Sequence, residues 1–206
     1  MKILSIESAS TVCGTALFIN NELIDIIELN KARIHSEELP VMVKKILNNN
    51  NLNVPELNGI AVSEGPGSYT GLRIGISLAK GLAVANNIPI IPVPTLQAIN
   101  QDINEKGIYW VIIHSHKDMV YTQKFNSGTP VSKIKYSKFD INKFSKIYGF
   151  NLDKLCSNKE YFSILPSSKL IGKLAIERFS DWAKNDHSLI TPNYITDFNF
   201  NKVLSN

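Results

Sequence analysis

The chain has 206 residues, and its 22 Lys and Arg against 18 Asp and Glu give a formal net charge of +4. This length suits one domain or two small lobes, and such a mild, scattered charge permits contact with nucleic acid without arguing for it. The two cysteines, Cys13 and Cys156, are too few and too far apart for a disulfide framework or a zinc knuckle. No apolar run approaches the roughly 20 residues that cross a bilayer, and the N-terminal run is too short for a secretion signal. We therefore expect a soluble, cytoplasmic protein with no membrane partner.

The first half of the chain alternates strand and helix patterns. Apolar or alternating runs predict strands at 3–7, 14–19 and 23–29, and the Asn20-Asn21 pair between the last two is a hairpin signal. Apolar residues at helical spacing predict a helix from about Ser36 to Leu47. A strand at 58–63, a long helix after Gly67, a strand at 88–93 and a short helix from Thr95 to about Ile103 complete this half.

The second half repeats the same order of elements. Strands are predicted at 108–113, 119–125 and 131–137, then a helical piece, a strand near Ile147 and a helix over 168–183. The repetition predicts an α/β fold of two similar lobes, each with a three-strand meander plus helices, and a cleft between them. We expect the N-terminal lobe to span residues 1–104 and the C-terminal lobe residues 105–206.

The segment from Glu64 to Ile76 is the most informative part of the chain. Gly65-Pro66-Gly67 predicts a tight turn after a buried strand. In the helix that follows, Gly71, Gly75, Ala79 and Ala83 recur every fourth residue and share one face. Interior glycines cost roughly 1 kcal/mol each against alanine, so this pattern indicates that another backbone comes close. That backbone could belong to the protein's own sheet or to a partner's helix, and both interpretations stay open here.

The same segment does not match the familiar phosphate-binding loops. A Walker loop needs Lys and Ser or Thr after its glycines, whereas Gly71 is followed by Leu72 and Arg73. The glycine spacing also misses the dinucleotide fingerprint by one residue. An anion at this helix N-terminus stays compatible with the sequence.

A family resemblance is carried by the blocks 3–8 (ILSIES), 33–37 (RIHSE) with 39–40 (LP), 65–75 (GPGSYTGLRIG), 79–83 (AKGLA) and 93–96 (VPTL). The third block is long and specific. In these blocks, which lie in the first half, the chain resembles the TsaB (YeaZ) family, small proteins of actin-like ATPase (ASKHA) fold in bacterial tRNA threonylcarbamoyladenosine synthesis. The second half matches this family only weakly.

The resemblance implies a non-catalytic scaffold or activating subunit. Such proteins pair with a catalytic TsaD-like subunit, in a complex that includes a TsaE-like ATPase. ATP and a metal ion are expected in the partner, with no cofactor in this chain's own site and only indirect contact with tRNA. The catalytic relative carries a His-x-x-x-His metal pair after the strand that matches 90–93, where this chain has Thr95 and Ile99. We therefore expect no catalytic residues and no metal site here.

The expected partner interface lies on the two long helices of the first half. It consists of small and apolar residues: Leu39, Val43, Ile46, Gly71, Leu72, Gly75, Ile76, Ala79 and Ala83. Without a partner, such a face would be a solubility liability, so we expect the isolated protein to form a homodimer and the catalytic subunit to compete for the same surface.

Other readings rest on single sites. Glu7, with Ser8, Ser10 and Thr11, stands where actin-like proteins place an aspartate beside nucleotide phosphates, so a nucleotide-binding ATPase or kinase is the alternative function. The side chain of Glu7 is longer than that of an aspartate, and it therefore fits the strict coordination geometry of magnesium poorly. A metallopeptidase is a third reading, which the absent His pair opposes.

His114 and His116 are the one candidate pair of metal ligands in the sequence, because alternate residues of a strand point to the same side. No third ligand lies nearby in the sequence. The related family usually has Asp-Ala-Arg at this turn, so the role of the two histidines stays open.

Overall fold

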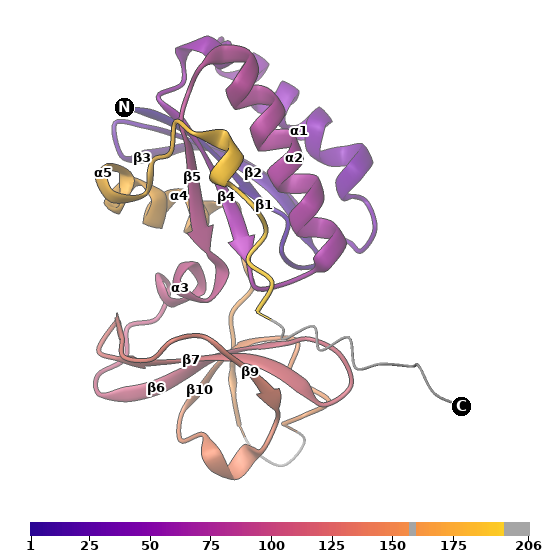
Figure 1. Cartoon of the computed structure of the whole chain (residues 1–206), viewed down its shortest axis with the longest axis vertical. Helices are drawn as coiled ribbons and strands as arrows, with labels where there is room; N and C mark the ends of the chain where they lie inside the picture. The colour runs from indigo at the N-terminus through magenta and orange to yellow at the C-terminus, as the bar shows by residue number, and fades with distance from the viewer. Residues whose placement is uncertain (157–159, 196–206) are drawn as a thin grey trace, which may run out of the picture.

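The computed structural model describes residues 1–156 and 160–195. Two lobes, each built on a mixed β-sheet, lie one above the other along the long axis of the molecule (Figure 1). The short helix α3 (Thr95–Asn100) carries the chain from the first sheet to the second. Within the described residues, no helix combines the length and apolarity needed to span a bilayer.

The first sheet has five strands in the order β3-β2-β1-β4-β5. β1 (Lys2–Glu7), β2 (Val12–Ile19) and β3 (Glu22–Asn30) form an antiparallel meander, and β4 (Gly59–Gly65) and β5 (Ile90–Pro94) extend it in parallel with β1. Asn20 and Asn21, with φ of 52° and 70°, form the β2–β3 turn, as the hairpin signal predicted. β1 and β4 are buried on both faces because helices cover both sides of the sheet.

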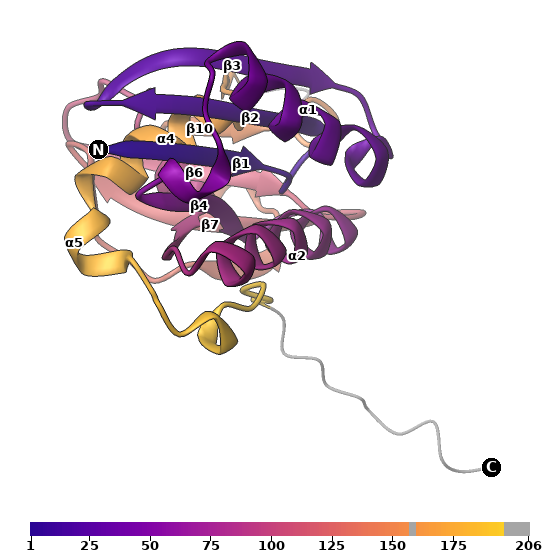
Figure 2. The same ribbon diagram turned by 90° about the horizontal axis from the view of Figure 1, so that it is seen from above.

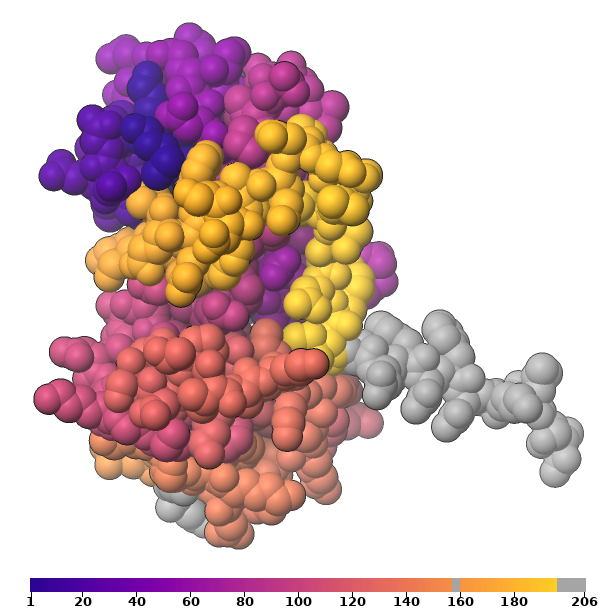
Figure 3. Space-filling view, turned by 60° about the vertical axis from the view of Figure 1, so that its left-hand side comes forward, coloured from indigo at the N-terminus to yellow at the C-terminus, as the bar shows by residue number. Residues whose placement is uncertain are grey.

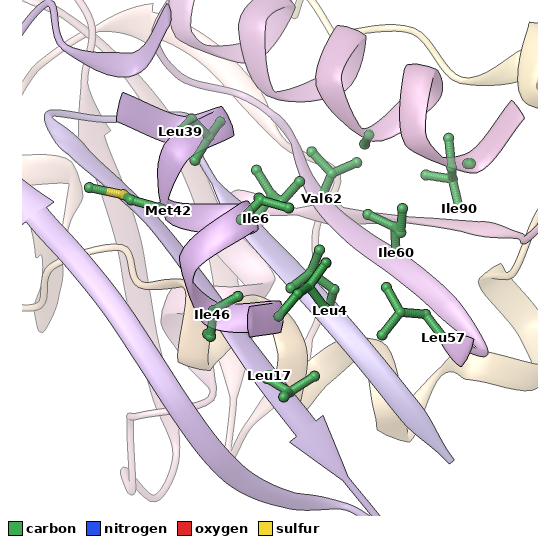
Figure 4. Close-up of a cluster of buried hydrophobic side chains, with 14 of the residues drawn as sticks. Leu4, Ile6, Leu17, Leu39, Met42, Ile46, Leu57, Ile60, Val62 and Ile90 are labelled. Atoms are coloured by element: carbon green, nitrogen blue, oxygen red, sulfur yellow. The ribbon is translucent and has the colours of Figure 1, made fainter. Parts of the chain in front are cut away.

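Helices α1 (His35–Asn49) and α2 (Tyr69–Asn86) lie side by side over one face of this sheet (Figure 2). Between the helices and the strands lies the largest apolar core, which includes Leu4, Ile6, Leu39, Ile46 and Ile60 (Figure 4). The 3₁₀ turn η1 (Val54–Glu56) joins α1 to β4. This arrangement fixes the start of α2 at the end of the sheet nearest the second lobe.

The opposite face of the first sheet is covered by helices that come from the second half of the chain. α4 (Ser168–Glu177) packs on β1 and β2, and α5 (Phe179–Trp182) follows it after a break at Arg178. The single helix expected over 168–183 is therefore two helices. The division of the chain at residues 104 and 105 stays a prediction, to which the structure adds that residues from Ser168 onward lie on the first sheet.

The second sheet has the order β11-β10-β6-β7-β8, with β9 also paired to β7. Its strands are β6 (Ile108–His114), β7 (Met119–Asn126), β8 (Thr129–Pro130), β9 (Lys135–Lys138), β10 (Ile147–Phe150) and β11 (Phe162–Ser163). One strand was expected over 131–137, but Ser132 interrupts it: the Ser132 hydroxyl accepts from the Lys124 amide at 2.9 Å, and its carbonyl accepts from Gln123 Nε2 at 3.1 Å.

Within the described residues no α-helix lies between the third and fourth strands of the second lobe, where a helical piece was expected. In its place stands one 3₁₀ turn, η2 (Ile141–Lys143), where the Asp140 carboxylate accepts from the Asn142 amide at 3.2 Å. The two lobes are therefore similar in their strands but not in their helices, because the second lobe contributes its long helix to the first sheet. A last 3₁₀ turn, η3 (His187–Leu189), lies in the segment that leads to the end of the described chain.

Candidate functional site

The turn before α2 packs directly on the loop between β1 and β2. Ser68 caps α2: its hydroxyl accepts from the Gly71 amide at 3.2 Å, while its own amide donates to the Ala9 carbonyl at 2.6 Å. A Cβ on Gly67 would overlap the Ala9 carbonyl oxygen. The tight turn predicted at Gly65-Pro66-Gly67 is confirmed, and it holds the first turn of α2 against residues 8–11.

The glycine stripe of α2 faces the protein's own interior. A Cβ on Gly71 would overlap the Ser8 carbonyl oxygen, and one on Gly75 would overlap the Ser8 hydroxyl. The close backbone that the stripe indicated is therefore that of Ser8, the first residue after β1. Of the two interpretations left open by the sequence, internal packing is correct for this face.

The partner interface predicted on the two long helices stays a prediction, but the residues chosen for it are not the accessible ones. All nine are buried in the structure: Leu39, Val43, Ile46, Gly71, Leu72, Gly75, Ile76, Ala79 and Ala83. Their periodicity correctly identified one face of each helix, but that face packs on the sheet. The accessible apolar stripe on α2 is displaced by one residue and consists of the partly buried Ile74, Leu78 and Leu82.

A shallow groove of about 290 Å³ runs beside this second stripe, between α1 and α2. Its lining mixes apolar side chains with one cation: Pro40, Val43, Lys44, Leu47, Asn48, Leu52, Asn53, Val54, Leu78 and Leu82. Val41 on α1 and Val84 on α2 are 59% and 62% exposed. The outer surface of the two helices is thus more apolar than is usual for helix faces that are exposed to solvent.

The acidic residue at the end of β1 does not reach the space between the lobes. Glu7 is fully buried; one carboxylate oxygen accepts from the Ala9 amide at 2.7 Å, and the other has no hydrogen-bond partner. Burial, together with the smaller effect of the Glu28 charge, raises the pKa of Glu7 to about 8, against the opposing hydrogen bond from the Ala9 amide. Ser8 is also fully buried, beneath α2. The predicted nucleotide set is therefore split, because only Ser10 and Thr11 line the cleft described next.

A cleft of about 1,210 Å³ lies between the lobes. Its first-lobe wall comes from the β1–β2 loop, the start of α1 and the start of α2; its second-lobe wall comes from β6, β7, β9 and β10. The lining residues are Ala9, Ser10, Thr11, Ala32, Arg33, His35, Ser36, Gly67, Ser68, Tyr69, Thr70, Gly71, Ile74, Ile113, His114, Ser115, His116, Tyr121, Tyr136, Phe150, Asn151 and Tyr194. Among these described residues none is Asp or Glu, and three of the chain's four histidines are present.

Histidines at the cleft already make structural hydrogen bonds. His35, the first residue of α1, donates from Nε2 to the Val12 carbonyl at 3.2 Å. His114 donates from Nε2 to the Lys117 carbonyl at 2.8 Å, and its Nδ1 lies 3.4 Å from Asn151 Nδ2. Because both His114 nitrogens have partners, this ring is not free to bind a metal. In the described part of the chain, no group of three or more His, Cys, Asp or Glu side chains could hold a metal ion.

The second-lobe wall is aromatic. The rings of Tyr121 and Tyr136 lie 4.9 Å apart, and the ring of His116 lies 6.4 Å from Tyr136. His116 is exposed and Tyr136 is half-buried, so both present ring surface to the cleft.

At the mouth of the cleft, three side chains tie the C-terminal segment to α2. Arg73 Nε donates to the Tyr194 hydroxyl at 2.7 Å, its guanidinium lies 3.9 Å from the Tyr69 ring centre, and the two tyrosine rings stack at 4.9 Å. The Asn193 amide donates to the Glu64 carbonyl at 2.8 Å. Figure 3 shows this segment as the yellow band that runs from the first lobe down to the second.

Sequence reasoning did not identify Tyr136, Tyr194 or Arg33 as cleft residues. They come from three distant parts of the chain, and although Arg33 begins the 33–37 block, nothing in that block indicates that its side chain lines the cleft. The repeated strand order did predict a cleft between lobes, but not which side chains of each lobe face it.

Comparison with known proteins places the chain in a family. A family model described as TsaD, tRNA N6-adenosine threonylcarbamoyltransferase, matches residues 26–170. The tRNA threonylcarbamoyladenosine biosynthesis protein TsaB of Buchnera aphidicola subsp. Acyrthosiphon pisum is 35% identical over 60% of this chain and 57% of its own length. The protein of the same name from Escherichia coli is 38% identical over 49% of this chain and 43% of its own length. The matched part thus spans about half the length of these curated relatives.

The solved structure titled YeaZ from Pseudomonas aeruginosa superposes with a TM-score of 0.75 at 20% identity, covering 94% of this chain and 99% of that one. At this identity the likeness shows the fold alone, and it extends over both lobes. The expected fold class, an actin-like (ASKHA) α/β fold of two lobes, is confirmed. The family model and the named relatives together show that the chain belongs to the TsaB (YeaZ) family, within the wider group that includes TsaD.

Proposed function

We propose that this chain takes part in tRNA threonylcarbamoyladenosine synthesis as a non-catalytic subunit that pairs with a TsaD-like transferase. The single observation that carries the proposal is its similarity to proteins named TsaB, at up to 38% identity in the segments compared. A TsaE-like ATPase completes the proposed complex, and ATP and the metal ion bind in the partner subunit rather than here.

The non-catalytic part of the proposal is supported by the residues at two positions. Thr95 and Ile99, which stand where the catalytic relative is expected to have its His pair, are 1% and 0% exposed and pack within the protein core. Their side chains offer no imidazole and no route to a ligand. Glu7 is likewise enclosed and does not line the cleft.

The outer surface of α1 and α2 is the proposed site of association. The transferase model matches most of this chain, so the two partners share the helices in question. Two homologous chains can therefore pair through equivalent helices about a pseudo-two-fold axis, as two copies of one chain do in a symmetric dimer. The Ile74, Leu78 and Leu82 stripe and the adjoining groove supply the apolar contact. In isolation, two copies of this chain pair through the same surface.

The test is association of the purified chain with the TsaD-like subunit from the same organism. Leu78→Asp places a charge on the proposed surface and should weaken association at least tenfold, because a buried unpaired charge is costly. Ile24→Asp is the matched control: Ile24 is an apolar residue 46% exposed on β3, outside the lining of the groove. Size-exclusion chromatography with light scattering measures homodimer and heterodimer, and circular dichroism confirms that both variants fold.

Two outcomes overturn the proposal. In the first, Leu78→Asp and Ile24→Asp associate alike, which places the interface elsewhere. In the second, the isolated chain turns over ATP or a threonylcarbamoyl donor at about 1 per second or faster, which is an enzyme-like rate. The mixed subunits, but not either one alone, should restore tRNA modification.

A further inference from the structure

We infer that the cleft between the lobes binds an unpaired nucleotide of an RNA strand, with its base on the Tyr136 wall and its phosphate at Arg33. The inference rests on the proposed function for the choice of RNA, and it revises the expectation of purely indirect contact with tRNA. It also differs from the predicted nucleotide set at Glu7 and Ser8, which the structure buries.

The second-lobe wall has the chemistry that holds a flat ring. Tyr121, Tyr136 and His116 follow one another along the wall, with ring centres 4.9 and 6.4 Å apart. The series ends at His116, which is exposed. Aromatic side chains in such an open position stack unpaired bases of any sequence, because every base has a π-face.

The first-lobe wall has the chemistry that holds an anion. Arg33 lies exposed at the rim, with no ion pair to any described carboxylate, and its backbone φ of 65° places it at a turn just before α1. Ser10 and Thr11 add hydroxyl groups to the same wall. The described lining residues include no carboxylate that would repel a phosphate.

The size of the cleft favours a strand over a free mononucleotide. Its volume of about 1,210 Å³ exceeds the roughly 300–1,000 Å³ of typical small-molecule sites. A duplex would keep its bases stacked inside, out of reach of the Tyr136 wall. The cleft therefore fits a single-stranded segment in which one base leaves its neighbours.

Binding of a fluorescein-labelled single-stranded RNA to the full chain tests the inference by fluorescence anisotropy. Tyr136→Leu should weaken binding about tenfold, because stacking is lost while bulk is kept. Phe162→Leu is its control, since Phe162 is 45% exposed on β11 and lies outside the cleft lining. Because Tyr136 also packs on Tyr121, His116→Ala at an exposed ring serves as a second variant, and thermal melting of each variant checks its fold.

Salt dependence separates the phosphate contact from stacking. Arg33→Gln should lower the slope of log affinity against log salt by about 0.7, the value for one phosphate contact on a single strand. Lys173→Gln, at an exposed lysine on α4, should leave the slope unchanged. Equal slopes for the two variants overturn the assignment of phosphate to Arg33.

Competition by AMP and by duplex RNA identifies the source of the nucleotide. Displacement by unlabelled single strand but not by duplex supports the inference; displacement by AMP at equal nucleotide concentration indicates a free mononucleotide and overturns the RNA assignment. Absence of RNA binding, or equal loss in Phe162→Leu and Tyr136→Leu, also overturns it. Association of the Tyr136→Leu variant with the TsaD-like subunit is measured in parallel, so failure of the cleft inference and failure of the proposed function are told apart.

Discussion

Gly75 of α2 lies directly on Ser8 at the end of β1. A Cβ at Gly75 would overlap the Ser8 hydroxyl and stand 3.0 Å from Ser8 Cβ, and Ser8 itself is fully buried. The close approach of helix and strand at this point holds the N-terminus of α2 at the wall of the cleft. The glycine is favoured because a fully buried serine occupies the space that its side chain would take.

Gly75→Ala should therefore destabilise the protein by about 1–3 kcal/mol, through overpacking against a fully enclosed residue. Gly81→Ala in the same helix is the control: nothing lies within 4 Å of a Cβ there, so alanine should stabilise by about 1 kcal/mol through helix propensity. Urea unfolding measures both. Adding Ser8→Gly to Gly75→Ala should recover most of the loss; equal effects at Gly75 and Gly81 would contradict this account.

Glu7→Gln should change how stability depends on pH. Burial raises the pKa of Glu7 from 4.5 to about 8, so the folded protein keeps a proton that the unfolded chain releases above about pH 4.5. The stabilisation from this group is fully present below pH 4.5 and is lost as the pH rises through 8, at roughly 1.4 kcal/mol per pH unit. Glutamine cannot ionise, so the free energy of unfolding of the variant should rise relative to that of the wild type by up to about 5 kcal/mol at pH 8.5.

Denaturant unfolding at several pH values between 4.5 and 8.5 measures this difference. Glu22→Gln, at an exposed glutamate on β3, is the control and should follow the wild-type curve. Parallel curves for Glu7→Gln and wild type would show that Glu7 is ionised in the folded protein.

Glu28→Ala should loosen α4 from the first sheet. One Glu28 carboxylate oxygen accepts from the Ser168 amide at 2.5 Å, the Ser168 hydroxyl at 2.6 Å and the Ser167 hydroxyl at 2.9 Å. Removing an ionised acceptor from buried donors costs about 2–3 kcal/mol. Glu28→Gln keeps an acceptor and should lose less. Thermal melting compares both with Glu22→Ala, and a loss no larger than that of Glu22→Ala would count against this role of Glu28.

Tyr194→Ala should free the C-terminal segment from α2. It removes the ring that stacks on Tyr69 and the hydroxyl that accepts from Arg73. The amide hydrogen of Asn193, which donates to the Glu64 carbonyl, should then exchange with solvent about tenfold faster. The reason is that the C-terminal segment can open locally without the cost of breaking the aromatic contact. Tyr161→Ala, in the second lobe, is the control for hydrogen exchange read by mass spectrometry. An unchanged Asn193 rate would place the anchor of this segment elsewhere.

Local patterns predicted most of the elements. The Asn20-Asn21 turn, the glycine turn before α2 and the succession of strands and helices along the first lobe follow from chemistry within a few residues, and each is confirmed. The face of α2 that meets a partner was not predictable in the same way. Periodicity identified Gly75, Ala79 and Ala83 as one face, but a small, apolar face looks alike whether it meets a sheet or another protein.

Long-range contacts account for the remaining differences. Nothing near Ser168 in the sequence indicates that its helix packs on β1, because the contact is made through Ser5, whose hydroxyl donates to the Ser168 carbonyl at 2.8 Å. The cleft residues Tyr136 and Tyr194 are likewise brought together only by the arrangement of the lobes.

The late position of α4 in the chain matters while the protein is being made. The first sheet has all its strands by Pro94, but the helix that covers its second face begins at Ser168. At the usual pace of translation, the interval from Asn100 to Ser168 lasts about 3–14 s. Throughout that time α4 does not yet cover the apolar side chains of Ile3, Phe18 and Ile91. The nascent chain should therefore bind chaperones that recognise exposed apolar sheet surfaces.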